Sequence, residues 1–145
     1  MRWNHPALCC LICVGFLAHC ETPVQKKTVV TAQWPDGTTH REVDVAAGDS
    51  IAVRMYHENG SLEKTGHYQN GLKHDAWRSF YPDGTPWSEH HYEKGIQIGD
   101  YKTWHPNGQQ FISGSYDDQG QPNGEWRFRS AEGELMRRVM GDSLR

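Results

Sequence analysis

After residue 20, short apolar and aromatic stretches alternate with polar turns, and the pattern returns at a nearly constant interval. A glycine ends a turn at positions 37, 60, 84, 108 and 133, so the intervals are 23, 24, 24 and 25 residues. Seven places before these glycines stand β-branched or aromatic residues: Val30, Val53, Trp77, Tyr101 and Trp126. About eight places after them stands a second column: Val45, Tyr68, Tyr92 and Tyr116. Self-similarity at this period indicates a repeat protein.

Each repeat has the composition of a β-hairpin. The turns contain Asp-Gly, Asn-Gly or Glu-Gly, and the first two pairs are typical of tight hairpin turns because their residues accept positive φ. An isolated hairpin is marginally stable, whereas stacked hairpins bury faces against their neighbours. The sequence therefore predicts an all-β fold over residues 29–141. We expect an elongated, single-layer antiparallel sheet of about ten short strands, in about five repeats with degenerate outer copies.

Longer segments carry a family resemblance. Residues 77–84 (WRSFYPDG), 92–101 (YEKGIQIGDY) and 104–108 (WHPNG), followed by Tyr116 and Trp126, resemble MORN repeats, in particular the bacterial variant of YwqK-family antitoxins. The resemblance covers residues 53–128 well and the outer copies weakly. Asp75 departs from the pattern, because the equivalent positions hold Gly99 and Gly124. The resemblance implies a scaffolding or protein-binding role and, for the YwqK family, neutralisation of a toxin.

Composition limits what this chain can be. It has 145 residues and a net charge of -3, with a mean hydropathy of -0.81. These values exclude two large domains and the bulk electrostatic binding of nucleic acid. Six Trp and six Tyr in so hydrophilic a chain indicate that aromatic side chains replace an aliphatic core.

The first residues have the character of an export signal. Ala7–Ala18 is an apolar run that is too short to span a bilayer as a helix and has the length of a signal-peptide core. Residues 17–20 (LAHC) resemble a bacterial lipobox, although His19 replaces the usual small residue. All four cysteines lie at or before Cys20, which fits an acylation site better than a disulfide framework.

We therefore expect a lipoprotein of the bacterial cell envelope. Residues 1–19 would be a lipoprotein-type signal peptide, Cys20 the lipid attachment site, residues 20–28 a tether and residues 142–145 a tail. The lipid would hold the protein on the periplasmic or extracellular side of a membrane. Ordinary secretion and an uncleaved anchor are the alternatives.

Alternation along the strands sorts the repeat columns onto two faces. The predicted packed face carries Val53, Met55 and His57, then Trp77, Ser79 and Tyr81, then Tyr101, Thr103 and His105, then Trp126 and Phe128. The opposite parity places a basic column, Arg54, Arg78, Lys102 and Arg127, beside an aromatic column of Tyr56, Phe80 and Trp104. Cation–π contacts along this candidate binding face would stabilise the sheet. Its functional interpretation is a groove for an anionic lipid head, a phosphorylated glycan or an acidic protein segment.

Metal-binding and catalytic motifs are not found in the sequence. His67 and His91 share one column and His57 and His105 another, but columns of successive repeats lie about 9.5 Å apart, too far to share one ion easily. The sequence holds no His-Glu-x-x-His, no Gly-x-Ser-x-Gly and no phosphate-binding glycine loop before a helix. We predict no metal, no cofactor and no enzymatic activity.

The leading functional hypothesis is a non-enzymatic, envelope-tethered module that binds an unidentified protein partner, with an antitoxin-like or immunity-like role implied by the resemblance. Exposed edge strands would also allow a homodimer. The second hypothesis is a module for anionic lipid headgroups or cell-wall glycan, with Tyr56, Phe80, Trp87 and Trp104 as stacking platforms beside the basic column. Nucleic acid is not an expected partner.

Overall fold

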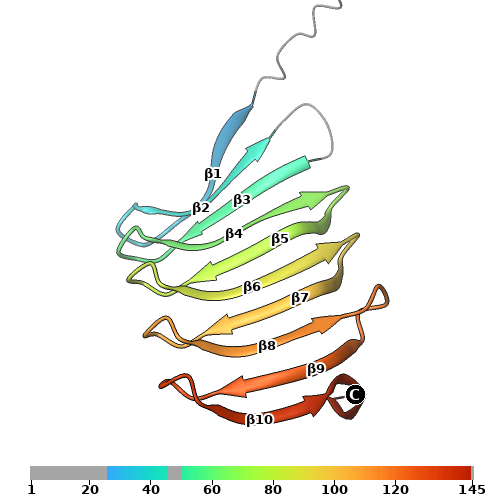
Figure 1. The fold of residues 1–145 in the computed structure, drawn as a ribbon. Coiled ribbons are helices and arrows are strands. Elements are labelled where there is room, and N and C mark those ends of the chain that lie inside the picture. The colour runs from blue at the N-terminus through green and yellow to red at the C-terminus, as the bar shows by residue number, and fades with distance from the viewer. Residues whose placement is uncertain (1–25, 46–49, 145) are drawn as a thin grey trace, which may run out of the picture.

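A single open antiparallel sheet accounts for nearly all of the described chain, residues 26–45 and 50–144 of a computed structural model (Figure 1). Its ten strands lie in sequence order from one end to the other. They are β1 Lys27–Gln33, β2 Thr39–Val45, β3 Ser50–Tyr56, β4 Leu62–Gln69, β5 Leu72–Phe80, β6 Pro86–Glu93, β7 Ile96–Trp104, β8 Gln110–Tyr116, β9 Pro122–Arg129 and β10 Leu135–Met140. A 3-10 helix, η1 Gly141–Leu144, follows β10. The prediction of an all-β, single-layer sheet of consecutive hairpins is confirmed.

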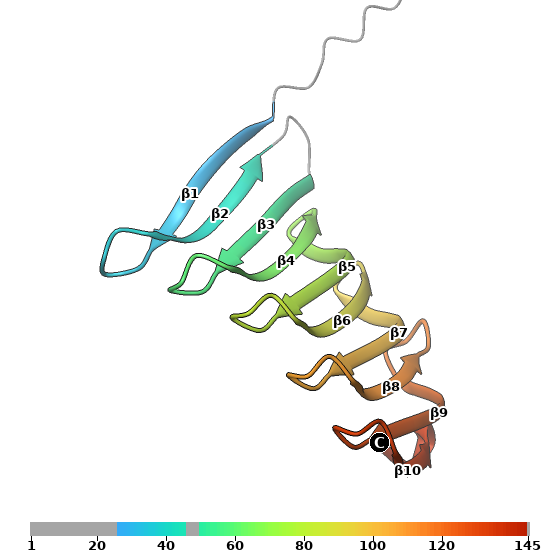
Figure 2. The same cartoon turned by 60° about the vertical axis from the view of Figure 1, so that its left-hand side comes forward.

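Five turns of one design lie along one edge of the sheet, and we call them the tip turns: residues 34–38, 57–61, 81–85, 105–109 and 130–134. In each, the first residue's N–H donates to the fifth residue's carbonyl, and the glycine N–H donates back to the first residue's carbonyl. The glycine has a φ of +80° to +87°, a left-handed conformation that other residues adopt at a cost. Figure 2 shows these turns stacked along the edge, one for each repeat.

The opposite edge has shorter connections. Asn70-Gly71 joins β4 to β5 and Lys94-Gly95 joins β6 to β7, with positive φ at both positions of each pair. Two successive positive φ values are the hallmark of a two-residue hairpin loop. The β8–β9 connection is longer and closes with the Asp117 N–H donating to Gln121 O.

The departure at Asp75 leaves the backbone of its repeat intact. Asp75 has a φ of 58°, close to the 64° of Gly99 and the 65° of Gly124. Asp is among the residues that enter this left-handed region most readily, so the repeat keeps its geometry without a glycine.

The core is a single row on the predicted packed face. Val53, Trp77 and Trp126 expose only 3%, 6% and 4% of their surface, and Ser79 and Thr103 on the same face are also buried. This confirms the sorting of the two faces by parity. Neighbouring rings continue the row with centroids 4.9 to 6.4 Å apart, through Tyr68, Trp77, Tyr92, His90, Tyr101, Tyr116 and Trp126. We call this the aromatic face.

Regular secondary structure extends beyond the predicted limits of the repeat domain at both ends. β1 begins at Lys27, two residues before the predicted start, and η1 occupies most of the predicted tail. A Cβ at Gly141 would lie 2.4 Å from the backbone of Pro122, so only glycine allows η1 to approach β9 this closely. Lys27 on β1 and Arg137 and Arg138 on β10 place cations on both outer strands, which disfavours the strand pairing expected of a homodimer.

Several predictions concern residues outside the described ranges. The signal peptide, Cys20 and most of the tether lie before residue 26. Over residues 26–45 and 50–144 the fold contains no helix of the length and apolarity needed to cross a membrane.

Candidate binding faces

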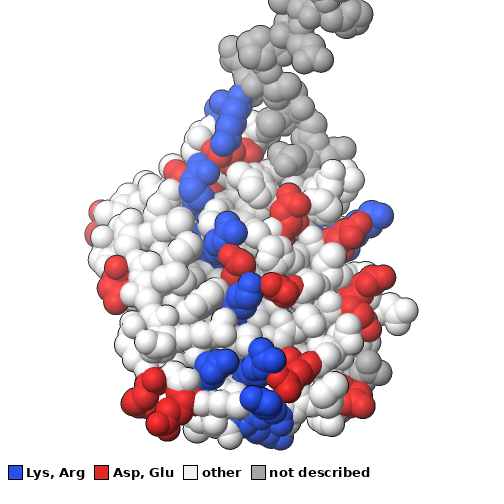
Figure 3. Space-filling view, viewed as in Figure 1, with Lys and Arg blue, Asp and Glu red and all other residues white. Residues whose placement is uncertain are grey.

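The basic column forms a straight row across the strands on the face opposite the aromatic one, which we call the charged face. The paired residues follow in unbroken order: Glu42, Arg54, Thr65, Arg78, Glu89, Lys102, Ser113, Arg127 and Arg138. An acidic or hydroxyl side chain separates the first four cations, whereas the last two stand directly opposite each other. Figure 3 shows Lys and Arg side chains crossing the sheet as a stripe, with Asp and Glu beside it.

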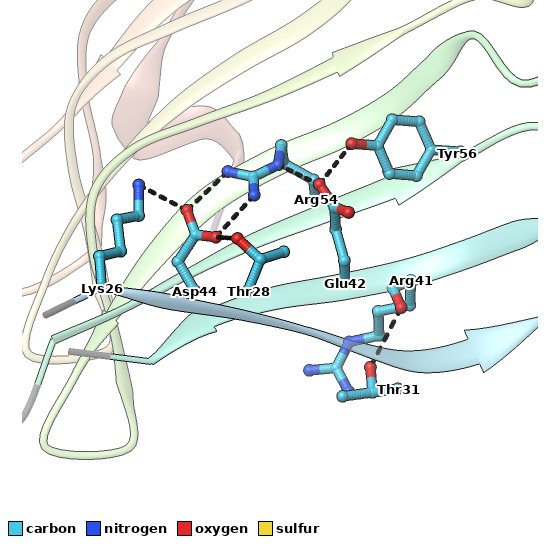
Figure 4. A network of polar contacts seen from close by, with 8 residues as sticks. All are labelled: Lys26, Thr28, Thr31, Arg41, Glu42, Asp44, Arg54 and Tyr56. Atoms are coloured by element: carbon cyan, nitrogen blue, oxygen red, sulfur yellow. Dashed lines mark hydrogen bonds and ion pairs between the residues drawn. The ribbon is translucent and has the colours of Figure 1, made fainter.

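At the N-terminal end of this row, Arg54 is held between two carboxylates (Figure 4). Its Nε donates to Glu42 Oε1 at 2.6 Å, and its two terminal nitrogens donate to Asp44 at 2.8 and 2.9 Å. The Tyr56 hydroxyl donates to Glu42 at 2.6 Å. The hydrogen bond from Tyr56, reinforced by Arg54, lowers the pKa of Glu42, while burial and the bond to Glu42 raise the pKa of Tyr56.

Asp44 is the most constrained member of this cluster. Only 3% of its side chain is exposed, and it accepts a hydrogen bond from Thr28 Oγ1 at 2.6 Å and pairs with Lys26 Nζ at 2.6 Å. Hydrogen bonds from Arg54, Lys26 and Thr28 hold the pKa of Asp44 far below its ordinary value, and Asp44 in turn raises the pKa of Arg54. The cluster joins β1, β2 and β3, so Arg54 has a structural role and little freedom to meet a ligand.

The other three cations of the basic column have looser surroundings. Each has one carboxylate partner: Arg78 with Glu89 at 2.6 Å, Lys102 with Asp100 at 2.8 Å and Arg127 with Glu125 at 2.5 Å. The side chains of Arg78 and Arg127 are 51% and 49% exposed, against 28% for Arg54. Both donate only through Nε to groups in the described chain, which leaves their terminal nitrogens for solvent or a ligand.

A shallow hollow of about 240 Å³ lies in the charged face between Lys102 and Arg127. Small residues of β8, residues 113–115 (SGS), line it, and the two ion pairs with Asp100 and Glu125 flank it. Two cations, their two carboxylate partners and the hydroxyl groups of Ser113 and Ser115 therefore border one depression. This arrangement can receive an anionic oxygen group such as a carboxylate or a phosphate.

The aromatic members of the candidate binding face do not stack on its cations. Tyr56, Phe80 and Trp104 lie beside the row, but the cation–π contacts within the described residues are made by Lys73, whose Nζ lies 4.7 Å from the Trp77 ring on the aromatic face. The expected cation–π ladder on the charged face is therefore wrong. A carboxylate stands opposite each cation or two residues away from it. A charge-assisted hydrogen bond to this carboxylate is stronger than a contact with the face of an aromatic ring.

Trp87, which the second hypothesis named as a stacking platform beside the basic column, does not accompany Phe80 and Trp104. Ser79 pairs with Ser88 and Phe80 with Pro86, so Trp87 is the extra residue of a β-bulge. Its ring lies beside that of Tyr81, with centroids 6.4 Å apart, at the tip turns. A bulge interrupts the alternation of side chains, so the position of this ring does not follow from its place along the strand.

A ladder of hydrogen bonds links each tip turn to the next repeat, and sequence reasoning missed it. The first residue of a tip turn donates to a carbonyl on the following strand pair: Trp34 Nε1 to Tyr56 O at 3.1 Å, His57 Nε2 to Phe80 O at 3.0 Å, Tyr81 Oη to Trp104 O at 3.0 Å and His105 Nε2 to Arg129 O at 2.9 Å. These bonds assign the proton of both histidines to Nε2. The signal was available, because the column three places before each glycine always holds a side-chain donor.

The histidines therefore contribute to the architecture. His57 and His105 belong to the ladder, and burial lowers the pKa of His90, which packs against Tyr101. No three side chains of His, Cys, Asp or Glu in the described part of the chain are grouped to hold a metal ion.

Uniform hairpins, the ladder between them and the in-register row define a β-hairpin repeat protein with extended faces. Residues 52–70 and 76–94 match the family model described as MORN repeat variant. These two segments, which span β3 to β6, thus match the MORN repeat variant. Such repeats generally serve in binding and are typically non-catalytic, and no catalytic family is identified in the chain.

Wider comparisons add little. A search of curated proteins finds no match to this chain. Among solved structures, the crystal structure of TarM aligns with 81% of this chain at 9% identity and a TM-score of 0.36. The alignment covers 21% of the TarM chain, so this protein spans about a fifth of its length, and a likeness at this level supports no functional argument.

Proposed function

We propose that this protein is a non-enzymatic binding module that holds an acidic segment of a partner protein on its charged face. The observation that carries the proposal is the basic column, in which Arg78, Lys102 and Arg127 follow one another every second strand, at intervals of about 9.5 Å. One carboxylate orients each cation and leaves outward donors. The general use of MORN repeats in binding supports this role.

The cations of the basic column can exchange their own carboxylates for those of a partner at little energetic cost. Exposed ion pairs contribute about 0 to 1 kcal/mol to stability, so loosening them for a partner's carboxylates costs the fold little. The guanidinium groups of Arg78 and Arg127 can then receive two-pronged hydrogen bonds from a carboxylate. Because Arg54 is enclosed by its own acids, the binding surface is centred on β5 to β9.

The second part of the proposal concerns location. The apolar run Ala7–Ala18 and the lipobox-like residues before Cys20 support export and lipidation, which would place the sheet at a bacterial envelope surface with an antitoxin-like or immunity-like role outside the cytoplasm. Labelling with a palmitate analogue tests the anchor, and the label should disappear in Cys20→Ser. A toxin-like reading frame beside this one would support the immunity role, and its absence would weigh against it.

A charge-reversal experiment tests the binding face. The pair Arg78→Glu and Lys102→Glu is compared with Lys27→Glu and Arg137→Glu, which make the same charge change on the exposed outer strands. A fluorescein-labelled decaglutamate, phosphatidylglycerol vesicles and peptidoglycan serve as probes. We expect the first pair to weaken decaglutamate binding about tenfold or more and to reduce its salt dependence, while the control pair has a smaller effect. Equal effects from both pairs would refute a specific face.

The hollow between Lys102 and Arg127 favours one further candidate. A phosphate of a lipid headgroup or of a cell-wall glycan could bind the two cations and the Ser113 hydroxyl. Tighter, charge-dependent binding to vesicles or peptidoglycan than to decaglutamate would select this function over the first.

A further inference from the structure

The tip-turn edge carries a strip of exposed apolar side chains that the fold does not use. Trp87, Phe111 and Met136 stand three places after successive turn glycines and are 48%, 37% and 70% exposed. Each is the extra residue of its bulge. The rings of Trp87 and Phe111 lie beside Tyr81 and His105, which the hydrogen-bond ladder holds in place. We call these three residues the tip strip.

The same edge is acidic. The tip turns contain five acids and neither Lys nor Arg: Asp36, Glu58, Asp83, Glu132 and Glu134. On the face shown in Figure 3, the edge of the tip turns displays acidic side chains without basic ones. This edge thus has the charge opposite to that of the basic column, and its electrostatic complement is a cationic partner.

A cleft continues the tip strip toward the N-terminal repeats. It has a volume of about 460 Å³ and is lined by Trp34, His57, Glu58, Asn59, Glu63 and Pro82. Glu63 occupies the place of Trp87 in the preceding repeat. Neither Glu58 nor Glu63 forms an ion pair with another described residue. The cleft therefore offers two carboxylates beside an aromatic ring, which suits a Lys or Arg side chain.

The backbone of this edge is already used, which restricts how a partner can bind. The N–H groups of the first residue and of the glycine bond within each turn, and Pro82 O accepts from Asn59 and Ser61 while Ala131 O accepts from Asn107. A partner strand would find few backbone groups to pair with. Recognition must proceed through the side chains of the tip strip and the acids.

The spacing of the strip selects one backbone conformation for the partner. Equivalent residues in successive repeats lie about 9.5 Å apart, and three residues of polyproline II helix rise about 9.3 Å. In an extended strand, side chains on one face recur every 6.6 to 6.8 Å or so, which does not match this interval. Seven residues of α-helix rise about 10.5 Å, so a helix would fall out of register with the strip by about 1 Å per repeat. Aromatic rows are also the surfaces on which polyproline II segments dock. The Trp87 indole N–H, which bonds to no described residue, can donate to a carbonyl of such a segment.

We propose that the tip strip and its cleft bind a cationic, proline-rich segment in the polyproline II conformation. A Lys or Arg enters the cleft beside Glu58 and Glu63, and prolines or apolar residues at every third position lie over Trp87, Phe111 and Met136. This surface is separate from the basic column, which attracts partners of the opposite charge.

Fluorescence anisotropy with the full-length chain tests the proposal. The probe is a labelled peptide of two lysines followed by nine prolines, and we expect saturable binding that weakens with salt. Trp87→Ala should weaken binding about tenfold, because a central aromatic anchor typically dominates a small interface. Leu72→Ala, which removes a side chain that is 49% exposed at the opposite edge, is the matched control and should bind like the wild type.

Charge and conformation are tested separately. Glu58→Gln with Glu63→Gln should weaken binding and flatten its salt dependence, whereas Arg78→Glu with Lys102→Glu should not weaken it. Trp87→Phe keeps a ring and should retain part of the affinity, which distinguishes a lost contact from a misfolded variant. The proposal fails if binding of the peptide does not saturate, or if Trp87→Ala binds the peptide with the wild-type affinity. It also fails if an acidic proline-rich peptide or a cationic helical peptide binds more tightly than the probe.

Discussion

The indole ring of Trp77 occupies the space that a side chain at Gly66 would need. A Cβ at Gly66 would lie 2.2 Å from Cδ2 of that ring, and a Cβ at Gly114 would lie 2.2 Å from Cδ2 of Trp126. Between these two pairs, Tyr101 meets His90 edge to face with centroids 4.9 Å apart. The core is only one row of side chains thick, so these ring positions account for much of its packing.

Gly66→Ala should therefore destabilise the protein strongly. The new methyl group has to displace the Trp77 ring from the sheet, and we expect a loss of about 3 kcal/mol, as for a severely overpacked core. Urea denaturation measures the change. Ser113→Ala, which removes only a hydroxyl from the charged face, should cost under about 0.5 kcal/mol. A Gly66→Ala protein that unfolds at the wild-type midpoint would contradict the packing described above.

The two buried tryptophans should differ in their tolerance of phenylalanine. Trp77 Nε1 donates to His67 O at 3.0 Å, whereas the buried Trp126 Nε1 has no partner in the described residues. Trp77→Phe should therefore reduce the free energy of unfolding by about 1 kcal/mol more than Trp126→Phe. Denaturation of the two variants under the same conditions provides the comparison, and an equal or reversed order would show that the indole bond contributes nothing.

Asp75→Gly should stabilise the protein. The left-handed φ of 58° costs an L-residue about 1 to 2 kcal/mol, while glycine adds about 0.5 to 1 kcal/mol of unfolded-state entropy. The expected net gain is about 0.5 kcal/mol, measured by thermal or urea unfolding. Gly99→Ala, at the equivalent place, should have the opposite sign. If both substitutions destabilise, conformational strain is not the governing effect.

Acid should weaken the Arg54 cluster through Asp44. The ordinary pKa of Asp44 is 3.8 and its folded-state pKa is lower, so the stabilisation is complete above about pH 4 and declines as the pH falls toward the folded-state value. Asp44→Asn should melt at a lower temperature at pH 7 and lose less stability on acidification than the wild type. Thermal unfolding from pH 7 to pH 2 measures how steeply the melting temperature of each protein depends on pH. Asp118→Asn, exposed in the β8–β9 turn, should keep the wild-type slope.

Tyr81→Phe should loosen the tip-turn edge with little change elsewhere. The substitution removes one bond of the ladder, from Tyr81 Oη to Trp104 O at 3.0 Å, and should cost about 1 kcal/mol. Amide hydrogen exchange should become faster in residues 81–85 and 105–109. If the exchange rates of the variant equal those of the wild type throughout the sheet, the ladder does not couple neighbouring repeats.

Local chemistry explains why so much of the fold could be predicted. The turn glycines and the residues before them specify hairpins through backbone preferences of two or three residues, and alternation then separates Val53 and Trp77 from Arg54 and Arg78. Neither inference needs a distant contact. The fit of Asp75 to a glycine position follows from the same local rule.

The binding faces depended on relations across strands. The sequence showed four cations in a column, but the cross-strand register decides that Arg54 is enclosed by Glu42 and Asp44 while Arg78 and Arg127 stay exposed. The bulge at Trp87 removes that ring from the charged face and adds it to the tip strip. Parity cannot foresee a bulge, because one extra residue shifts every later side chain.

The sequence by itself determined the repeat, the hairpins and the existence of two unlike faces, since each follows from short-range preferences copied at a fixed interval. The tertiary structure alone decided which cations remain exposed, where Trp87 lies and how His57 and Tyr81 connect one repeat to the next. The enclosure of Arg54 and the ladder depend on contacts between residues 10 to 24 places apart, and such contacts exist only when the strands are paired in register.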